Sequence, residues 1–397
     1  MRKGWEYKKL GEVCEVVTGT TPKTNIPEYW GKGHYWVTPA ELNDTTVYID
    51  KTERQITDEA LSKTKLRLLP VGTVLLSSRA PIGKVAIANA EMYCNQGFKN
   101  CICSEAIYNK YLFYFLRLKK DYLNSLGRGA TFKEISKSIV ESIKIPLPPK
   151  STQLAIVTEL DKINELIRLK KEQLKDFDNL AQSLFYEMFG DPVENEKGWE
   201  VKKLGEISSL ICNGNTPKGG SEVYVDNGIL FLRSQNVWKN RLDLDDVAFI
   251  DEATHKTLKK SALNHHDLLI TKTGRINTEN SSLGRTALFE GEDGSANING
   301  HVYLVRLKEG MVHKYVLYIL ISNSYRELIR RTCVGGIDKR QLNKNHIEDF
   351  PIILPPLPLQ RLFAQRIEQI EREKSEVQKS IQDLKTLLAS RMQYWFE

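Results

Sequence analysis

Basic side chains recur in glycine-containing segments that have the composition of turns. Arg79 and Lys84 lie in one such segment, and Arg128 and Lys133 lie in another. Backbone N–H groups exposed beside glycine, threonine hydroxyls and basic side chains bind phosphate oxygens, and Arg, Lys, Asn and Gln also bind base edges. The chemistry that these segments offer is therefore contact with nucleic acid.

Segments of the same character occur later in the chain, at Thr271–Arg275 and Val334–Arg340. One such segment alone is more often a solvated turn, so their repetition carries the interpretation. The residues that we predict to contact DNA are Thr20, Lys23, Arg79, Lys84, Arg128, Lys133, Lys218, Arg233, Gln235, Asn236, Lys272, Arg275, Lys339 and Arg340.

Sequence motifs of catalysis are missing from the chain. It has no GxxxxGK[ST] phosphate loop, no glycine-rich dinucleotide fingerprint, no HExxH and no GxSxG. Its six cysteines show no CxxC spacing, which argues against a zinc site and a disulfide framework. We therefore predict no catalytic residue, no metal ligand and no cofactor bound by this chain.

Charge is distributed unevenly along the sequence. Residues 1–150 carry 23 Lys and Arg against 15 Asp and Glu, whereas residues 191–357 carry 22 of each kind. A basic balance permits a polyanionic partner. We expect the first of these regions to supply more of the salt-dependent affinity for DNA.

The sequence also predicts where the protein works. No uncharged apolar stretch approaches the roughly 18–20 residues of a membrane span, and the first residues lack the apolar core of a signal peptide. We expect a reduced, cytoplasmic protein with no membrane partner.

An internal duplication organises these segments. Gly4–Val13 and Gly198–Ile207 are identical at eight of ten positions, and the turns at Thr21–Lys23 and Thr216–Lys218 repeat the sequence T-P-K. Each copy ends at a proline-rich hinge. The predicted fold class is α+β, with two similar mixed α/β domains separated by two long helices in a pseudo-two-fold arrangement. Short strands are expected at 47–49, 73–76, 84–88, 267–271, 285–289 and 302–306, and helices at 58–64, 109–120 and 314–331.

The two long helices carry a heptad pattern. Apolar residues recur in alternating steps of four and three along 153–189, and again 207 positions later along 360–396. About five heptads favour a coiled coil over two amphipathic helices that each cover their own domain. The predicted seam is Ile156, Leu160, Ile163, Ile167, Leu174, Phe177, Leu184, Phe363, Ile367, Ile370, Val377, Ile381, Leu384 and Leu388. The predicted boundaries are 1–150, 151–190, 191–357 and 358–397.

Two lysines interrupt this seam. In an antiparallel pairing Lys170 lies opposite Ile381 and Lys374 lies opposite Phe177, so each aliphatic stem has an apolar neighbour. A parallel pairing also gives each lysine an apolar neighbour. The sequence pattern thus leaves the orientation of the helices open.

Taken together, the repeated motifs resemble those of a known family. The repeated motifs are the GWE-x-KKLGE openings, the T-P-K turns, the strand and turn at Asp267–Gly274, the stretch Arg79–Lys84 and the P-L-P-P-x-x-x-Q entry to the first long helix. They are similar to those of the specificity subunit of type I restriction–modification systems.

This resemblance implies a function and partners. Each domain would be a target recognition domain that binds one half of a bipartite, asymmetric double-stranded DNA target, and the helices would pair antiparallel. The subunit would be non-catalytic and would bind two modification subunits, which carry S-adenosylmethionine, with restriction subunits completing the nuclease. Because recognition domains vary within that family, the predicted DNA contacts rest on loop chemistry alone.

Two other classes of protein remain open. The chain could be a duplicated coiled-coil adaptor that does not bind DNA, or a stand-alone nuclease or methyltransferase. The missing catalytic motifs argue against the second class.

Overall fold

The computed structural model describes residues 5–129, 133–276, 278, 280–336 and 339–397. Within these ranges, no helix is both long enough and apolar enough to cross a membrane. The chain forms two compact units, Met1–Lys171 with Lys379–Glu397 and Glu172–Gln378. Each unit thus contains one globular domain and parts of both long helices, so the units cut across the four segments expected from the sequence.

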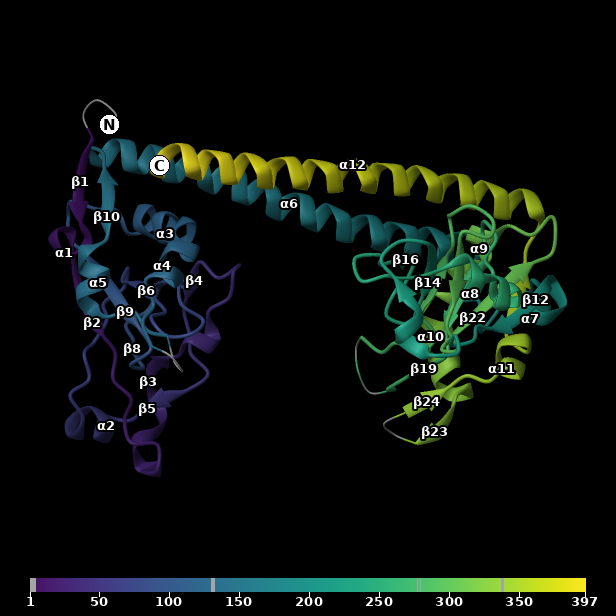
Figure 1. The fold of residues 1–397 in the computed structure, drawn as a ribbon, viewed down its shortest axis with the longest axis horizontal. Coiled ribbons are helices and arrows are strands. Elements are labelled where there is room, and N and C mark those ends of the chain that lie inside the picture. The colour runs from purple at the N-terminus through teal and green to yellow at the C-terminus, as the bar shows by residue number, and fades with distance from the viewer. Residues whose placement is uncertain (1–4, 130–132, 277, 279, 337–338) are drawn as a thin grey trace. The chain divides into compact units, whose positions relative to one another are not determined.

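The first globular domain alternates short strands and short helices (Figure 1). Its elements are β1 (Glu6–Lys9), α1 (Leu10–Val13), β2 (Cys14–Thr18), η1 (Pro27–Tyr29), β3 (Trp30–Val37), η2 (Pro39–Glu41), β4 (Tyr48–Ile49), β5 (Gln55–Ile56), α2 (Asp58–Lys63), β6 (Val74–Leu76), β7 (Val85–Ala88), β8 (Tyr93–Cys94), β9 (Lys99–Cys103), α3 (Asn109–Leu118), α4 (Lys120–Ser125), α5 (Lys137–Ser142) and β10 (Lys144–Leu147).

The second globular domain repeats this order with additions. Its elements are β11 (Glu200–Lys203), α7 (Leu204–Ile207), β12 (Ser208–Asn213), η3 (Gly220–Val223), β13 (Tyr224–Val225), β14 (Ile229–Leu232), β15 (Val237–Trp238), β16 (Arg241–Leu242), β17 (Ala248–Ile250), α8 (Glu252–Thr257), η4 (Lys259–Ser261), β18 (Leu268–Thr271), β19 (Thr273–Gly274), β20 (Thr286–Leu288), β21 (Ala296–Ile298), β22 (Val302–Leu307), α9 (His313–Leu320), α10 (Asn323–Thr332), β23 (Val334–Gly336), β24 (Lys339–Gln341), α11 (Lys344–Glu348) and β25 (Pro351–Leu354).

The sheets confirm the predicted duplication. The strand order β2-β9-β6-β7 in the first domain corresponds to β12-β22-β18-β20 in the second. A smaller sheet, β5-β3-β8, corresponds to β17-β14-β21, and in both the last pair is parallel. The pairs β1-β10 and β11-β25 close each domain beside its long helix.

One predicted helix is wrong in the second domain. Residues 314–331 were expected to be continuous, but the structure has α9 and α10 with a break before Asn323. The Ser322 hydroxyl accepts a hydrogen bond from the Tyr325 amide and caps the second helix. An N-capping serine starts a new helix because its side chain satisfies an amide that has no partner in the helix.

The long helices are α6 (Lys150–Phe189) and α12 (Leu357–Phe396). Both begin one turn earlier than the heptad pattern indicated, directly after a proline pair that suits a first helical turn. A buried glutamine fixes each start. The Gln153 amide donates to the Pro148 carbonyl at 3.0 Å, and the Gln360 amide donates to the Pro355 carbonyl at 2.7 Å.

The two helices pair antiparallel in each unit. In the first unit Arg391, near the end of α12, donates to Glu159, near the start of α6, at 3.1 Å. In the second unit Lys374 forms an ion pair with Asp178. The seam pattern left the orientation open, whereas the family resemblance implied antiparallel helices. These two ion pairs confirm the antiparallel pairing, and Asp178, the partner of Lys374, is adjacent to Phe177, the residue expected opposite it.

The predicted seam residues lie between the helices or against the domain cores. Those that are buried are Ile156, Leu160, Ile163, Ile167, Phe363, Ile367, Ile370, Val377 and Ile381. Leu174, Phe177, Leu184, Leu384 and Leu388 are partly buried. Burial is therefore deepest where the helices also touch a domain.

The seam pattern missed the residues that join the helices to the domains. Phe185 and Phe189 are buried with Phe363 and Tyr315 in the core of the second domain, and Phe185 and Phe363 lie 5.6 Å apart between ring centroids. In the first domain, Phe396 packs into the core with its ring 5.0 Å from that of Tyr111. A strict alternation of four-residue and three-residue steps selects Leu184 as a seam residue and omits the adjacent Phe185.

The antiparallel pairing predicts a pH effect. The hydrogen bond from Arg391, assisted by Trp395 at 3.0 Å, holds the pKa of Glu159 below its ordinary value of 4.5. A carboxylate whose pKa is lower in the folded than in the unfolded chain stabilises the fold above the unfolded pKa, and that stability is lost as the pH falls through the folded pKa. Glu159→Gln should therefore lower the thermal midpoint slightly at neutral pH and change it little once the pH is well below the folded pKa of Glu159, where the native carboxyl is also uncharged.

Glu187→Gln on the same helix is the matched control and should shift the midpoint at neither pH. Equal effects of the two substitutions would show that the contact between the helices contributes nothing to stability.

Candidate nucleic-acid interface

Main-chain hydrogen bonds bring three loops of the first domain together. The Ser78 amide donates to the Gly97 carbonyl at 2.7 Å, and the Ile135 amide donates to the Ser78 carbonyl at 3.0 Å. Arg128 and Glu134 exchange two main-chain hydrogen bonds of 3.0 Å and close the third loop. We call the loops 77–84, 95–97 and 127–134 the first loop cluster.

The second domain has the same arrangement. The Lys272 amide donates to the His301 carbonyl at 2.8 Å, and the Leu342 amide donates to the Lys272 carbonyl at 2.9 Å. Strands β23 and β24 form the hairpin that corresponds to 127–134. We call the loops 271–285, 299–301 and 333–342 the second loop cluster. Residues 130–132 and 337–338 of the predicted turns lie outside the described residues, as does Gly4 of the repeated opening.

The T-P-K turns lie against these clusters. A β-carbon on Gly19 would lie 1.9 Å from the Asn95 carbonyl oxygen, and one on Gly214 would lie 1.9 Å from that of Ile298. Only glycine allows such a close approach of two backbones. Thr20 and Lys23, together with Lys218 in the second copy, are thereby held beside the loop clusters.

Tryptophan side chains fix the first of these turns. The Trp36 indole donates to the Thr20 carbonyl at 3.2 Å, and the Trp30 indole donates to the Lys23 carbonyl at 3.2 Å. The Lys23 side chain itself is exposed. The turn is therefore fixed through its backbone, which leaves the ammonium group available to a ligand.

Some predicted contacts are already engaged within the first domain. Arg79 forms an ion pair with Glu134 at 2.9 Å, and Lys99 approaches the same carboxylate at 3.0 Å. Burial alone would raise the pKa of Glu134, but hydrogen bonds from Lys99 and Arg79 bring that pKa below its ordinary value. To bind a phosphate, Arg79 would therefore have to break its ion pair with Glu134 or bind both groups at once.

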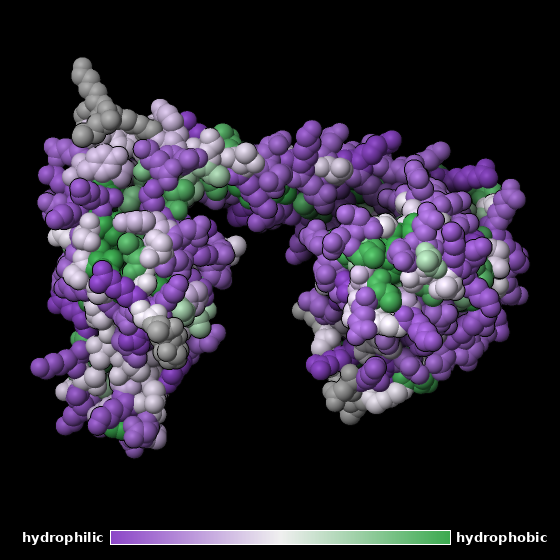
Figure 2. Space-filling model, viewed as in Figure 1, coloured by the Kyte–Doolittle hydropathy of each residue, from purple (hydrophilic) through white to green (hydrophobic). Residues whose placement is uncertain are grey.

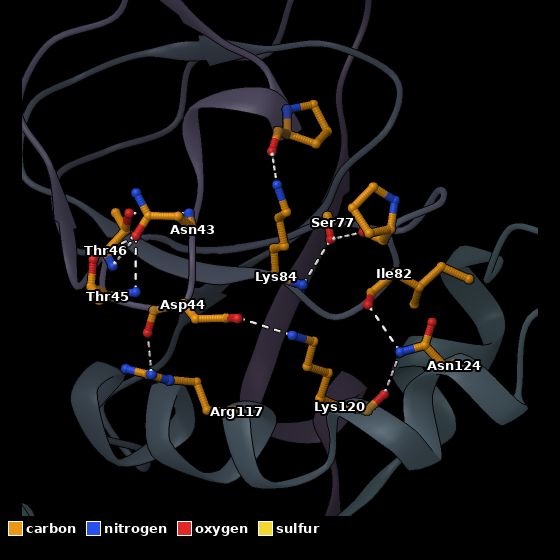
Figure 3. A network of polar contacts seen from close by, with 12 residues as sticks. Asn43, Asp44, Thr45, Thr46, Ser77, Ile82, Lys84, Arg117, Lys120 and Asn124 are labelled. Carbon is orange, nitrogen blue, oxygen red and sulfur yellow. Dashed lines mark hydrogen bonds and ion pairs between the residues drawn. The ribbon is translucent and has the colours of Figure 1, made fainter. Parts of the chain in front are cut away.

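Lys84 is also engaged, as Figure 3 shows. Its ammonium group donates to the Pro39 carbonyl at 3.1 Å. Asp44 lies nearby and pairs with Lys120 at 2.9 Å, and that pairing lowers the pKa of Asp44. The side chain of Lys84 thus connects the first loop cluster to the 39–46 loop.

The cations that stay available in the first loop cluster are Arg128 and Lys133. Both are exposed, and their side chains form no hydrogen bond or ion pair with other described residues. They lie on the loop that Arg128 and Glu134 close. Arg128 and Lys133 are therefore the predicted cations of this cluster that the first domain leaves accessible to a ligand.

The second loop cluster encloses an open polar basin of about 450 Å³. Arg275 enters it from one loop and Lys339 from the β23–β24 hairpin, and both side chains are exposed. The Lys272 ammonium lies 5.8 Å from the centre of the Tyr303 ring, and Arg340 donates to the Cys333 carbonyl at 3.3 Å. The structure thus brings four predicted residues of the second domain into one region.

Three other predicted residues instead hold a neighbouring loop in place. Asn236 is 1% exposed, and its amide donates to the carbonyls of Asp243 at 2.9 Å and Asp246 at 3.0 Å. Arg233 and Gln235 both contact the Asp246 carboxylate, at 3.3 and 2.8 Å. The structure thus places the Asn236 amide inside the domain with its own hydrogen-bond partners, and not at the surface where a base could reach it.

Sequence reasoning also left out Arg285, which lines the basin beside Arg275. The motif Leu283-Gly284-Arg285 corresponds to Ile82-Gly83-Lys84, and this correspondence could have suggested it. Within the described ranges, no three His, Cys, Asp or Glu side chains are placed to hold a metal ion. What the loop clusters offer is cationic and polar contact to a polyanion.

Comparison with known proteins identifies relatives with this duplication. A family model described as the type I restriction modification DNA specificity domain matches residues 2–176 and 196–385. The MjaIX specificity subunit of Methanocaldococcus jannaschii is 32% identical, over 97% of this chain and 91% of its own length. The EcoKI specificity subunit of Escherichia coli is 22% identical, over 96% of this chain and 84% of its own length.

Solved structures share the fold. A chain from a structure concerned with complex assembly and conformational transition of a type I restriction–modification system superposes with a TM-score of 0.65 at 21% identity, over 99% of this chain and 97% of that chain. The type I S subunit of M. genitalium gives a TM-score of 0.52 at 15% identity, over 99% and 96% of the two chains.

The loop clusters predict different outcomes for exposed cations and for the buried amide. Arg275→Gln combined with Lys339→Gln should weaken binding to duplex DNA and leave the free energy of unfolding unchanged, because both side chains are exposed. Asn236→Ala should lower the free energy of unfolding by about 1–3 kcal/mol, because it leaves buried polar groups without partners. Fluorescence anisotropy and urea denaturation measure the two effects.

If Asn236→Ala instead kept its full free energy of unfolding and changed the base preference of binding, Asn236 would be a DNA contact after all.

Proposed function

Because the chain belongs to the family of type I restriction–modification specificity subunits, we propose that it binds a bipartite DNA target, one half with each globular domain. The observation that carries this proposal is the duplicated loop cluster. The same main-chain hydrogen bonds at Ser78 and Lys272 present different side chains in the two domains. Two like scaffolds with unlike side chains suit two unlike half-sites, and hence an asymmetric target.

The subunit acts without catalytic residues of its own in this proposal. S-adenosylmethionine and the methyl transfer belong to two modification subunits that bind the long helices, and restriction subunits complete the nuclease. In this proposal the complex binds and modifies DNA in the cytoplasm.

Exposed leucines on both helices support a docking role. In the first unit Leu166, Leu169 and Leu387 are exposed, and in the second unit Leu180 and Leu362 are exposed. The side of the helices that Figure 2 shows is mostly hydrophilic, with scattered hydrophobic residues. Leu166 and Leu169 are three residues apart on α6, so they lie on the same face of the helix and form an apolar patch. A contiguous exposed apolar patch marks a surface that another protein covers.

Mapping of methylated sites tests the function and the role of the helices. Cells that produce this chain with its modification subunits should methylate one motif of two fixed parts and a constant spacer. Duplicating Asn164–Lys170 in α6 and Ile381–Leu387 in α12 adds a matching heptad to both helices. Since each heptad adds about 10 Å at 1.5 Å per residue, the spacer should grow by up to about three base pairs while both parts keep their sequence.

An unchanged spacer in the lengthened protein, with methylation still active, would exclude the helices as the element that sets the distance. Methylation without a sequence preference would contradict the specificity function itself.

The docking role predicts the effect of charges on the helix surface. Leu166→Glu combined with Leu169→Glu should reduce the amount of modification subunit that co-purifies with this chain, because burying a carboxylate in an apolar interface is costly. Circular dichroism should show the helices intact. Leu68→Glu, at an exposed leucine of the first globular domain, is the matched control. Retention of both modification subunits by the double variant would place the docking surface elsewhere.

A further inference from the structure

An arginine–tryptophan stack in the second domain lies beside the basin. The Arg285 guanidinium carbon lies 3.8 Å from the centre of the Trp238 ring, and that of Arg241 lies 5.3 Å from it. The Trp238 indole donates to the Gln235 carbonyl at 2.9 Å, which fixes the ring. A guanidinium stacked on a fixed ring keeps its N–H groups at the edge of the stack, where they can bind a ligand.

Arg285 is oriented by main-chain groups and forms no ion pair with another residue of the described ranges. Its Nε donates to the Ser281 carbonyl at 3.0 Å, and its terminal nitrogen donates to the Asn280 carbonyl. Both partners are uncharged main-chain groups. Burial, then the nearby Arg326 and Arg241, lower the pKa of Arg285, so the charged groups that act on it are themselves cations.

Lys239, the residue after Trp238, belongs to the same group of cations because Arg326 also acts on it. Burial, then Arg326, lower the pKa of Lys239, and Asp178 of α6 acts in the opposite direction. Burial, then Arg330, lower the pKa of Arg326 on α10, and Glu327 acts in the opposite direction. Arg241 is exposed, and Arg285 and Arg326 are partly exposed. We call Lys239, Arg241, Arg285 and Arg326 the cationic surface.

The first domain uses the corresponding position differently. The Lys84 amide donates to the Ser77 hydroxyl at 2.9 Å, as the Arg285 amide donates to that of Thr271 at 2.8 Å. The side chain of Lys84 then turns to the Pro39 carbonyl, whereas that of Arg285 stacks on Trp238. The cationic surface is thus a feature of the second domain, although the net charge of that region is zero.

We propose that the cationic surface binds phosphates of the DNA strand next to the half-site that the second domain recognises. This inference rests on the proposed function. Arg285 lines the basin together with Arg275 and Lys339, so the cationic surface continues directly from the second loop cluster. Because it combines several cations with a fixed aromatic ring, it suits a regular row of phosphates.

The test uses the full chain assembled with its modification subunits and the double substitution Lys239→Gln with Arg241→Gln. The affinity for DNA is measured over a salt series. One duplex contains the target motif that methylation mapping identifies, and the other has an unrelated sequence. Each lost phosphate contact should reduce the slope of log affinity against log salt by about 0.9, so the double variant should lose up to about 1.8 on both duplexes. The recognised motif should stay the same.

Lys259→Gln with Lys260→Gln is the matched control, since it removes the same charge from exposed residues of the same domain, at η4. Ethylation of single phosphates should locate the contact. In the native protein, ethylation of certain phosphates beside the second half-site should block binding. In the variant Lys239→Gln with Arg241→Gln, ethylation of the same phosphates should leave binding unchanged.

Two results would overturn the inference. One is a salt slope that matches the control, with the ethylation pattern unchanged. The other is loss of a modification subunit with normal DNA contacts, which would make this surface a protein-binding site. Failure of the native complex to prefer any DNA sequence would instead overturn the proposed function.

Discussion

The main-chain hydrogen bonds at Ser78 and Lys272 are the constraint on which both loop clusters depend. Each of these residues donates to one neighbouring loop and accepts from another through backbone atoms alone. The close approach at Gly19 and Gly214 likewise joins backbone to backbone. Because these contacts place no demand on side chains, the side chains that face a ligand can differ while the loops keep their positions. A family whose members recognise different sequences needs this separation of scaffold and contact.

Much of the fold could be predicted from the sequence because it follows from local patterns. Heptad spacing identified both long helices, and the repeated openings identified the duplication. The seam pattern did not determine how the two helices pair, since Lys170 and Lys374 fit either orientation. The antiparallel prediction came from the family resemblance, and the contacts of Asp178 and Glu159 confirm it. The break before Asn323 was missed because one capping serine outweighed a continuous helical pattern.

The interface was less predictable than the fold. Residue type alone could not distinguish Arg275, which lines the basin, from Arg233, which binds Asp246. The net charge of residues 191–357, which is zero, likewise gave no indication of the cationic surface in the second domain. Asp267, 1% exposed in its side chain, pairs with Arg306 at 2.7 Å. Such a pair adds nothing to the total, so net charge does not show where the remaining cations gather, as they do around Arg285.

The division of the long helices between the units has a consequence for synthesis on the ribosome. The first unit contains Lys379–Glu397, and Phe396 belongs to the core of the first domain. When residue 171 emerges, this domain therefore still lacks part of its core, and the apolar side of α6 is uncovered. The second unit, which ends at Gln378, has all its residues earlier. The part of the protein made first is thus completed last, when Phe396 joins the core of the first domain.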